Sequence, residues 1–157
     1  MGRPAAGIPA WVSNLALITT LALATAAGAA SAEFVRVKVP TANIRSGPGV
    51  QYERLWATYE NYPLRVVGKR GRWLQTLDFE GYEGWIYAPL TDTQPTVVVR
   101  VERANVRSRP GRDSRLLATE FMGVAFRVLS RRGDWLRVEH ADGFRGWIYR
   151  ALVWGNR

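Results

Sequence analysis

The sequence of 157 residues has no cysteine, two methionines and a single histidine, His140. The absence of cysteine excludes disulfide bonds, thiolate metal sites and a cysteine nucleophile. One histidine without partners makes neither a zinc site nor a serine–histidine pair. The motifs of phosphate-binding loops, dinucleotide folds, zinc proteases and serine hydrolases are also missing. The sequence therefore predicts a protein that is not an enzyme and that needs no cofactor and no metal.

Residues 1–32 have the composition of a secretory signal peptide. Arg3 precedes an apolar run from Leu15 to Ala27, and Ala30-Ser31-Ala32 fits a cleavage site. The run of about 13 residues is shorter than the roughly 20 that span a bilayer, so no transmembrane span is expected in the mature chain. We expect a signal peptide helix that is removed after Ala32, and an exported, periplasmic or envelope-associated product. An uncleaved N-terminal anchor is the alternative.

The most informative feature that is present is an internal repeat: residues 37–90 return without a gap as residues 99–152. "ANIRSGPG" returns as "ANVRSRPG", and "GWIYAPL" returns as "GWIYRAL". About twenty of the paired positions are identical, which indicates one structural unit that has been duplicated. We expect a first domain over 33–91, a linker over 92–96 and a second domain over 97–157.

Each unit consists of short alternating apolar and polar runs separated by Gly, Pro, Asn and Asp. "FVRVKV" and "TVVVRV" open the two units, and the Asp142-Gly143 dipeptide is typical of a tight hairpin turn. Five or so short strands in about 55 residues can bury one face only by curling into a small barrel. The sequence therefore predicts an all-β protein with two small β-barrels in tandem.

The order of these motifs resembles a known family. A-N-[IV]-R-S-x-P-G, then a hydrophobic strand, G-x-W-L and G-W-I-Y-x-x-L occur in that order in both units, as in the bacterial SH3-like (SH3b) domain. The resemblance implies tandem SH3-like barrels and a non-catalytic binding module of exported, cell-wall and envelope proteins. The partner it favours is peptidoglycan, its stem peptides or a wall-associated protein. A protein–protein scaffold or adaptor for an envelope enzyme or transporter is the alternative.

Positions that match between the two copies are expected to serve the fold. Strand parity predicts that Tyr59 lies in the core and that Trp56, on the opposite face of the same strand, is exposed. Gly81 and Gly84, with their counterparts in the second copy, suit turns or a close backbone approach. The interior positions expected from parity are Leu55, Leu117, Val66, Val128, Leu74, Leu136, Ile86 and Ile148.

Aromatic side chains supply a candidate ligand-binding groove. Trp73 and Tyr87 have the parity opposite to Leu74 and Ile86, so they are expected to form an outward aromatic cluster on adjacent strands. Such rings stack on peptides or sugars. The alternative is that a long loop, residues 40–54, or the other unit covers them. The candidate groove comprises Tyr52, Trp56, Tyr62, Trp73, Trp85 and Tyr87.

Positive charge is concentrated in the second copy. Residues 33–92 contain 8 basic and 7 acidic residues, whereas residues 93–157 contain 13 arginines and 6 acidic residues. Arginine binds carboxylate and phosphate bidentately, so an acidic peptide, a wall phosphate or an anionic membrane surface is a possible partner. An ordinary solvated surface is the alternative, and nucleic acid is not expected for an exported chain. The candidate anion site comprises Arg103, Arg109, Arg112, Arg115, Arg137 and Arg145.

Overall fold

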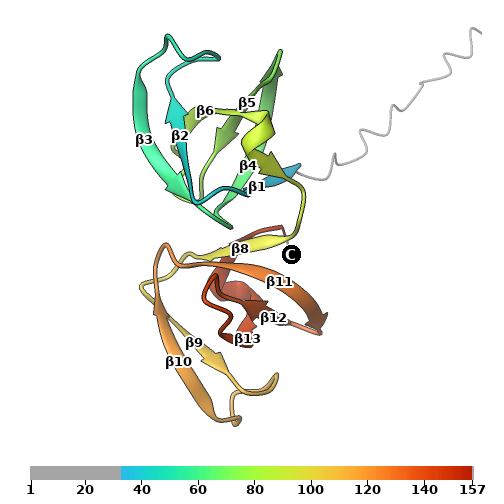
Figure 1. Ribbon diagram of the computed structural model, residues 1–157. Helices are drawn as coiled ribbons and strands as arrows, with labels where there is room; N and C mark the ends of the chain where they lie inside the picture. The colour runs from blue at the N-terminus through green and yellow to red at the C-terminus, as the bar shows by residue number, and fades with distance from the viewer. Residues whose placement is uncertain (1–32, 157) are drawn as a thin grey trace, which may run out of the picture. The chain divides into compact units, whose positions relative to one another are not determined.

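The computed structural model describes residues 33–156. The expected signal peptide and its cleavage site at Ala32 lie outside these residues. The described chain is all-β and forms two curled antiparallel sheets of seven strands each (Figure 1). We call residues 33–92 the first repeat and residues 96–156 the second repeat.

The first repeat has the strand order β3-β2-β6-β5-β4-β1-β7. Its elements are β1 (Phe34–Val37), β2 (Thr41–Arg45), β3 (Arg54–Tyr59), β4 (Pro63–Arg70), β5 (Trp73–Leu77), β6 (Glu83–Tyr87), the 3-10 turn η1 (Ala88–Leu90) and β7 (Thr91–Asp92).

The second repeat has the equivalent order β10-β9-β13-β12-β11-β8-β14. Each of its elements begins 62 residues after its counterpart in the first repeat. They are β8 (Thr96–Val99), β9 (Arg103–Arg107), β10 (Leu116–Phe121), β11 (Ala125–Arg132), β12 (Trp135–Glu139), β13 (Arg145–Tyr149), η2 (Arg150–Leu152) and β14 (Val153–Gly155).

Each sheet has seven strands rather than about five because the chain returns to its own first strand. After β6 the 3-10 turn reverses the chain, and β7 pairs antiparallel with β1 through Val37 and Thr91. The segment expected to be a linker, residues 92–96, thus contains the last residue of β7 and the first residue of β8, and residues 93–95 join the two repeats. A connector this short keeps the repeats close together.

One hydrophobic cluster fills each repeat. Leu74, Leu136, Ile86 and Ile148 are buried as the alternating pattern predicts. Val66 and Val128 are partly buried and pack against these clusters. A Cβ added at Gly84 would lie 2.2 Å from Cγ2 of Ile44, and Gly81 has a φ of 90°. These two glycines therefore serve a close approach and a turn, as expected.

The predictions for β3 are wrong, because its inward face carries Trp56 and Thr58 rather than Leu55 and Tyr59. Ile44 pairs with Trp56, whereas the next β2 residue, Arg45, pairs with Arg54, so Leu55 has no opposite residue. The bulged residue Leu55 lies on the same outward side as Ala57 and Tyr59. Leu55 and Tyr59, expected in the core, are each 44% exposed. Trp56, expected to be exposed, is partly buried and packs against the core of the first repeat.

Both repeats belong to a single compact unit. Val98 on β8 is a member of the hydrophobic cluster of the first repeat, and Trp154 on β14 packs against that cluster. The Trp154 ring meets Phe34 edge-on, with ring centroids 5.0 Å apart. The counterparts of Val98 and Trp154 in the first repeat are Arg36 and Asp92, which form an ion pair at 2.7 Å. A charged cross-strand pair in one repeat is thus an apolar pair in the other.

Candidate binding sites

Each repeat carries a groove at the same place on its outer surface, and the same residue type lines both grooves at five equivalent positions. We call them the first groove and the second groove. The shared lining residues are Asn43, Arg45, Trp73, Tyr87 and Leu90 in the first groove, and Asn105, Arg107, Trp135, Tyr149 and Leu152 in the second.

A cross-strand aromatic pair forms the floor of each groove. Trp73 on β5 lies directly opposite Tyr87 on β6, and their ring centroids are 5.4 Å apart. Trp135 and Tyr149 have the same arrangement at 5.5 Å. These side chains point outward because the alternate residues of the same strands, such as Leu74, are buried in the core. All four rings are half-buried, so each remains partly accessible at the surface.

An arginine in each groove fixes the loop that borders it. Nη1 of Arg45 donates to the carbonyl oxygens of Val50 and Tyr52, at 3.2 and 2.8 Å. Arg107 donates in the same way to the carbonyl oxygen of Ser114 at 2.8 Å. The long loop therefore forms one wall of the groove and leaves the aromatic floor open.

Charge distinguishes the two grooves. The first is lined by Thr41 and Val50 at positions where the second has Arg103 and Arg112. The Arg112 guanidinium lies 5.9 Å from the centroid of the Tyr149 ring. Both grooves contain the shared arginine, Arg45 or Arg107, and the second groove adds the two exposed cations Arg103 and Arg112.

Of the six arginines expected to bind an anion, only Arg103 and Arg112 line the second groove. Arg145 forms an ion pair with Glu139, which Arg127 also contacts. Hydrogen bonds from Arg127 and then Arg145 hold the pKa of Glu139 below its ordinary value. Arg109, Arg115 and Arg137 are exposed, and none of them lines this groove.

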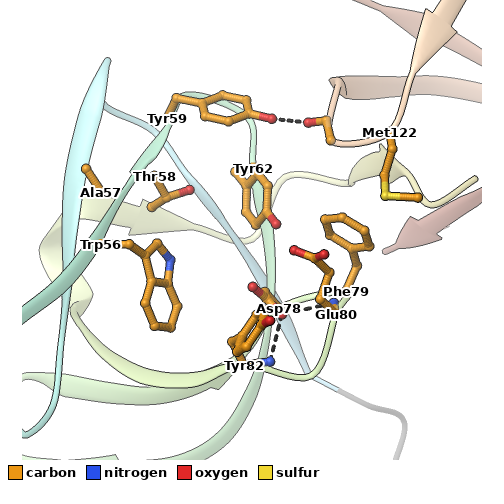
Figure 2. A pocket seen from close by; sticks show the side chains of 11 residues that line it. Trp56, Ala57, Thr58, Tyr59, Tyr62, Asp78, Phe79, Glu80, Tyr82 and Met122 are labelled. Carbon is orange, nitrogen blue, oxygen red and sulfur yellow. Dashed lines mark hydrogen bonds between the residues drawn. The ribbon is translucent and has the colours of Figure 1, made fainter. Parts of the chain in front are cut away.

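A third hollow lies on a different face of the first repeat, and Figure 2 shows its lining. We call it the aromatic–acidic pocket; its cavity is about 560 Å³. It is lined by Trp56, Ala57, Thr58, Tyr59, Tyr62, Asp78, Phe79, Glu80 and Tyr82 of the first repeat, with Met122 and Gly123 of the second repeat at its edge.

The rings of this pocket are held in contact with one another. Trp56 meets Tyr82 edge-on with centroids 6.3 Å apart, and Tyr59 meets Tyr62 in the same way at 5.3 Å. The Tyr59 hydroxyl donates to the carbonyl oxygen of Gly123 (Figure 2). Burial, followed by the charge of the nearby Asp78, raises the pKa of the Tyr62 phenol.

The six aromatic residues expected in one groove therefore fall into different places. Trp73 and Tyr87 line the first groove, and Tyr52 borders a shallow hollow beside them. Trp56 and Tyr62 line the aromatic–acidic pocket. Trp85 lines neither the first groove, nor the shallow hollow beside it, nor the pocket.

Sequence reasoning did not include several lining residues. These are Asn43, Arg45 and Leu90 of the first groove, and Asp78, Phe79, Glu80 and Tyr82 of the pocket. Asn43 and Arg45 belong to the motif that recurs in both copies, and this recurrence is the signal that could have identified them.

Within residues 33–156, no group of three His, Asp or Glu side chains gathers as a metal site. In the same part of the chain, no helix has the length and apolar character needed to cross a bilayer.

Residues 38–92 and 100–155 each match the profile of the family described as the bacterial SH3 domain. The chain belongs to the bacterial SH3 domain family. The two matches coincide with the two repeats, which confirms a tandem arrangement of this domain.

Among curated proteins, the chain is similar to YrvJ of Bacillus subtilis (strain 168), which is named as an N-acetylmuramoyl-L-alanine amidase. The two are 23% identical over 160 residues, covering 90% of this chain but only 30% of that protein.

Two solved structures are also similar. NlpC2 from Trichomonas vaginalis is 15% identical with a TM-score of 0.36, over 79% of this chain and 48% of that chain. An NlpC/P60 family protein from Bacillus cereus ATCC 10987 is 17% identical with a TM-score of 0.35, over 77% and 55%.

Proposed function

We propose that this protein is a non-catalytic binding module of the cell envelope that recognises peptidoglycan through its stem peptides. The observation that carries the proposal is that both repeats have a groove at the equivalent place, lined by the same five residue types. A duplicated fold requires the core residues to match, but it does not require an outward Trp–Tyr pair to match. The similarity to a protein named as an amidase of N-acetylmuramoyl-L-alanine, a wall component, supports the same partner.

The chemistry of the grooves suits an extended peptide. Partly exposed aromatic rings supply contact area at low entropic cost, and the adjacent asparagine can pair with a peptide group. In the second groove, Arg103 and Arg112 add attraction for the carboxylates of an acidic peptide. Two grooves on one chain can engage neighbouring peptides, which raises the overall affinity without new contacts.

Retention of the full chain on purified sacculi, at low and high salt, tests this proposal. We expect retention that weakens with salt, because part of the attraction is electrostatic. The double variant Trp73→Ala, Tyr87→Ala should lose about tenfold or more in affinity, the loss typical of buried aromatic contacts at an interface. The matching change at Trp135 and Tyr149 should have a comparable effect.

A charge-matched pair of variants separates groove recognition from general attraction. Arg103→Gln with Arg112→Gln should reduce retention and its salt dependence. Arg65→Gln with Lys69→Gln removes the same charge from exposed positions of β4 and should change little. Absence of retention at either salt would exclude the peptidoglycan proposal. Retention by a single envelope protein, but not by bare sacculi, would favour the scaffold alternative.

A further inference from the structure

The aromatic–acidic pocket differs from both grooves in charge. Its lining contains two carboxylates, Asp78 and Glu80, and no arginine or lysine. This is unusual in a chain with 22 basic and 13 acidic residues. A hollow of this composition attracts a cation and repels the acidic ligands that suit the second groove.

The aromatic lining also favours a cation. Aromatic rings carry partial negative charge on their faces and attract ammonium groups placed over them. Five rings surround this pocket, and two of them are well exposed: Tyr82 at 61% and Tyr59 at 44%. The Trp56 ring, the best acceptor of such contacts, lies against Tyr82.

Hydrogen bonds within the turn that carries Asp78 and Glu80 fix its position without a ligand. Oδ1 of Asp78 accepts hydrogen bonds from the backbone N–H groups of Glu80 and Tyr82, both at 2.9 Å (Figure 2). These bonds hold the turn that connects β5 to β6. The Glu80 side chain takes no part in them, so its charge can be removed without loosening the turn.

A buried hydroxyl without a partner is a second, independent sign of a ligand. Thr58 is only 4% exposed and lines the pocket. In the described part of the chain, its Oγ1 is the one buried side-chain oxygen or nitrogen that lacks a hydrogen-bond partner. Figure 2 shows this hydroxyl pointing toward the Tyr62 ring. Buried hydroxyls are normally paired, because an unpaired one destabilises the fold.

The second repeat lacks this lining and serves as an internal control. At the positions of Trp56, Tyr62 and Phe79 it has Ala118, Val124 and Ala141, and at the position of Thr58 it has Glu120. The fold does not require these residues, because the second repeat forms the same strands without them.

We infer that the aromatic–acidic pocket binds the primary ammonium group at the end of a diamino-acid side chain, such as lysine in a peptide. The rings enclose the aliphatic stem, the carboxylates of Asp78 and Glu80 balance the charge, and Thr58 Oγ1 accepts one N–H. A primary ammonium fits better than a quaternary one because it carries three N–H donors for these oxygens. This inference does not depend on the grooves.

Titration of the full chain with Nα-acetyl-lysine methylamide, followed by NMR, tests the inference. We expect shift changes at the Trp56 indole N–H and at Tyr82, and none with the norleucine or Nε-acetyl-lysine analogues. Equal binding of norleucine would overturn the inference, since the pocket would then be merely apolar. Tighter binding of trimethyl-lysine would also overturn it, since no N–H donor would be needed.

Variants assign the binding to this pocket. Thr58→Val should weaken binding about tenfold, the usual effect of losing a hydrogen bond to a charged group, without lowering the melting temperature. Glu80→Gln should weaken it severalfold, whereas Asp142→Asn, the equivalent position of the second repeat, should not. Equal loss in Glu80→Gln and Asp142→Asn would mean general attraction and would contradict the inference.

Two further ligands identify the source of the amine. A soluble muropeptide with a free diamino-acid amine and a lysine peptide of unrelated sequence carry the same chemistry. Tighter binding of the muropeptide would assign the site to the wall, and tighter binding of the lysine peptide would assign it to a protein. The Trp73→Ala, Tyr87→Ala variant should still bind Nα-acetyl-lysine methylamide. Lysine binding without retention on sacculi would therefore refute the proposed function alone.

Discussion

Replacing Trp154 by alanine should destabilise the whole described unit. This ring is partly buried against the core of the first repeat and meets Phe34 edge-on. A tryptophan enclosed in this way removes on the order of 100 Å² of apolar surface from water, which corresponds to about 2.5 kcal/mol at about 25 cal/mol per Å². The edge-on ring pair adds about 0.5–1 kcal/mol. We therefore expect Trp154→Ala to lower the free energy of unfolding by about 3 kcal/mol.

Differential scanning calorimetry is the suitable assay, because it does not rely on tryptophan fluorescence. The native chain should unfold in one transition, and the variant should melt roughly 10 °C lower, since 1 kcal/mol shifts the midpoint of a domain of this size by about 3–5 °C. If the contact couples the repeats, the variant should also show two separate transitions.

The control is Leu129→Ala, at a side chain that is 43% exposed. A surface truncation of this kind should cost no more than about 0.5 kcal/mol. If Trp154→Ala and Leu129→Ala had equal effects, the assignment of Trp154 to the core of the first repeat would be refuted.

Two other changes test the packing inside the first repeat. The guanidinium of Arg36 donates to Asp92 and lowers the pKa of that carboxyl. A carboxylate whose pKa is lowered in the folded state stabilises the fold above about pH 4, and this stabilisation is lost as the pH falls. Asp92→Asn should therefore lower the free energy of unfolding by about 1 kcal/mol at neutral pH, and by less at about pH 3; a difference in denaturant midpoint that does not vary with pH would contradict this. Gly84→Ala should destabilise by about 1–3 kcal/mol, because the new Cβ would lie 2.2 Å from Ile44 Cγ2, and an unchanged melting temperature would count against it.

The fold could be predicted from the sequence because its strongest signals are local and occur twice. The turn motifs and the "GWIY" strands are enough to identify the family, and β5 and β6 follow a regular alternation from Trp73 to Tyr87. The outward Trp–Tyr pair was predictable for the same reason.

The faces of β3 could not be predicted, because apolar side chains occur on both of them: Leu55 and Tyr59 on one face and Trp56 on the other. Which face lies inward depends on the pairing of the strand with its neighbour, here Ile44 with Trp56, and not on the strand alone. Counting from Leu55 placed Tyr59 in the core and Trp56 on the surface. The same error left Tyr59 out of the candidate groove, although it lines the aromatic–acidic pocket together with Trp56 and Tyr62.

Arg36 and Asp92 of the first repeat are replaced by Val98 and Trp154 at the equivalent positions of the second, and this difference determines which repeat comes first. If the order of the two repeats were reversed, the ion pair, in which the Asp92 side chain is still 31% exposed, would have to be covered at the junction, where desolvation of a charge is costly. The apolar pair would then be exposed to solvent and could promote self-association. The repeats are therefore not interchangeable, because the residues differ at two equivalent positions of each repeat. An engineered chain that exchanges the repeats would have to exchange these two pairs as well.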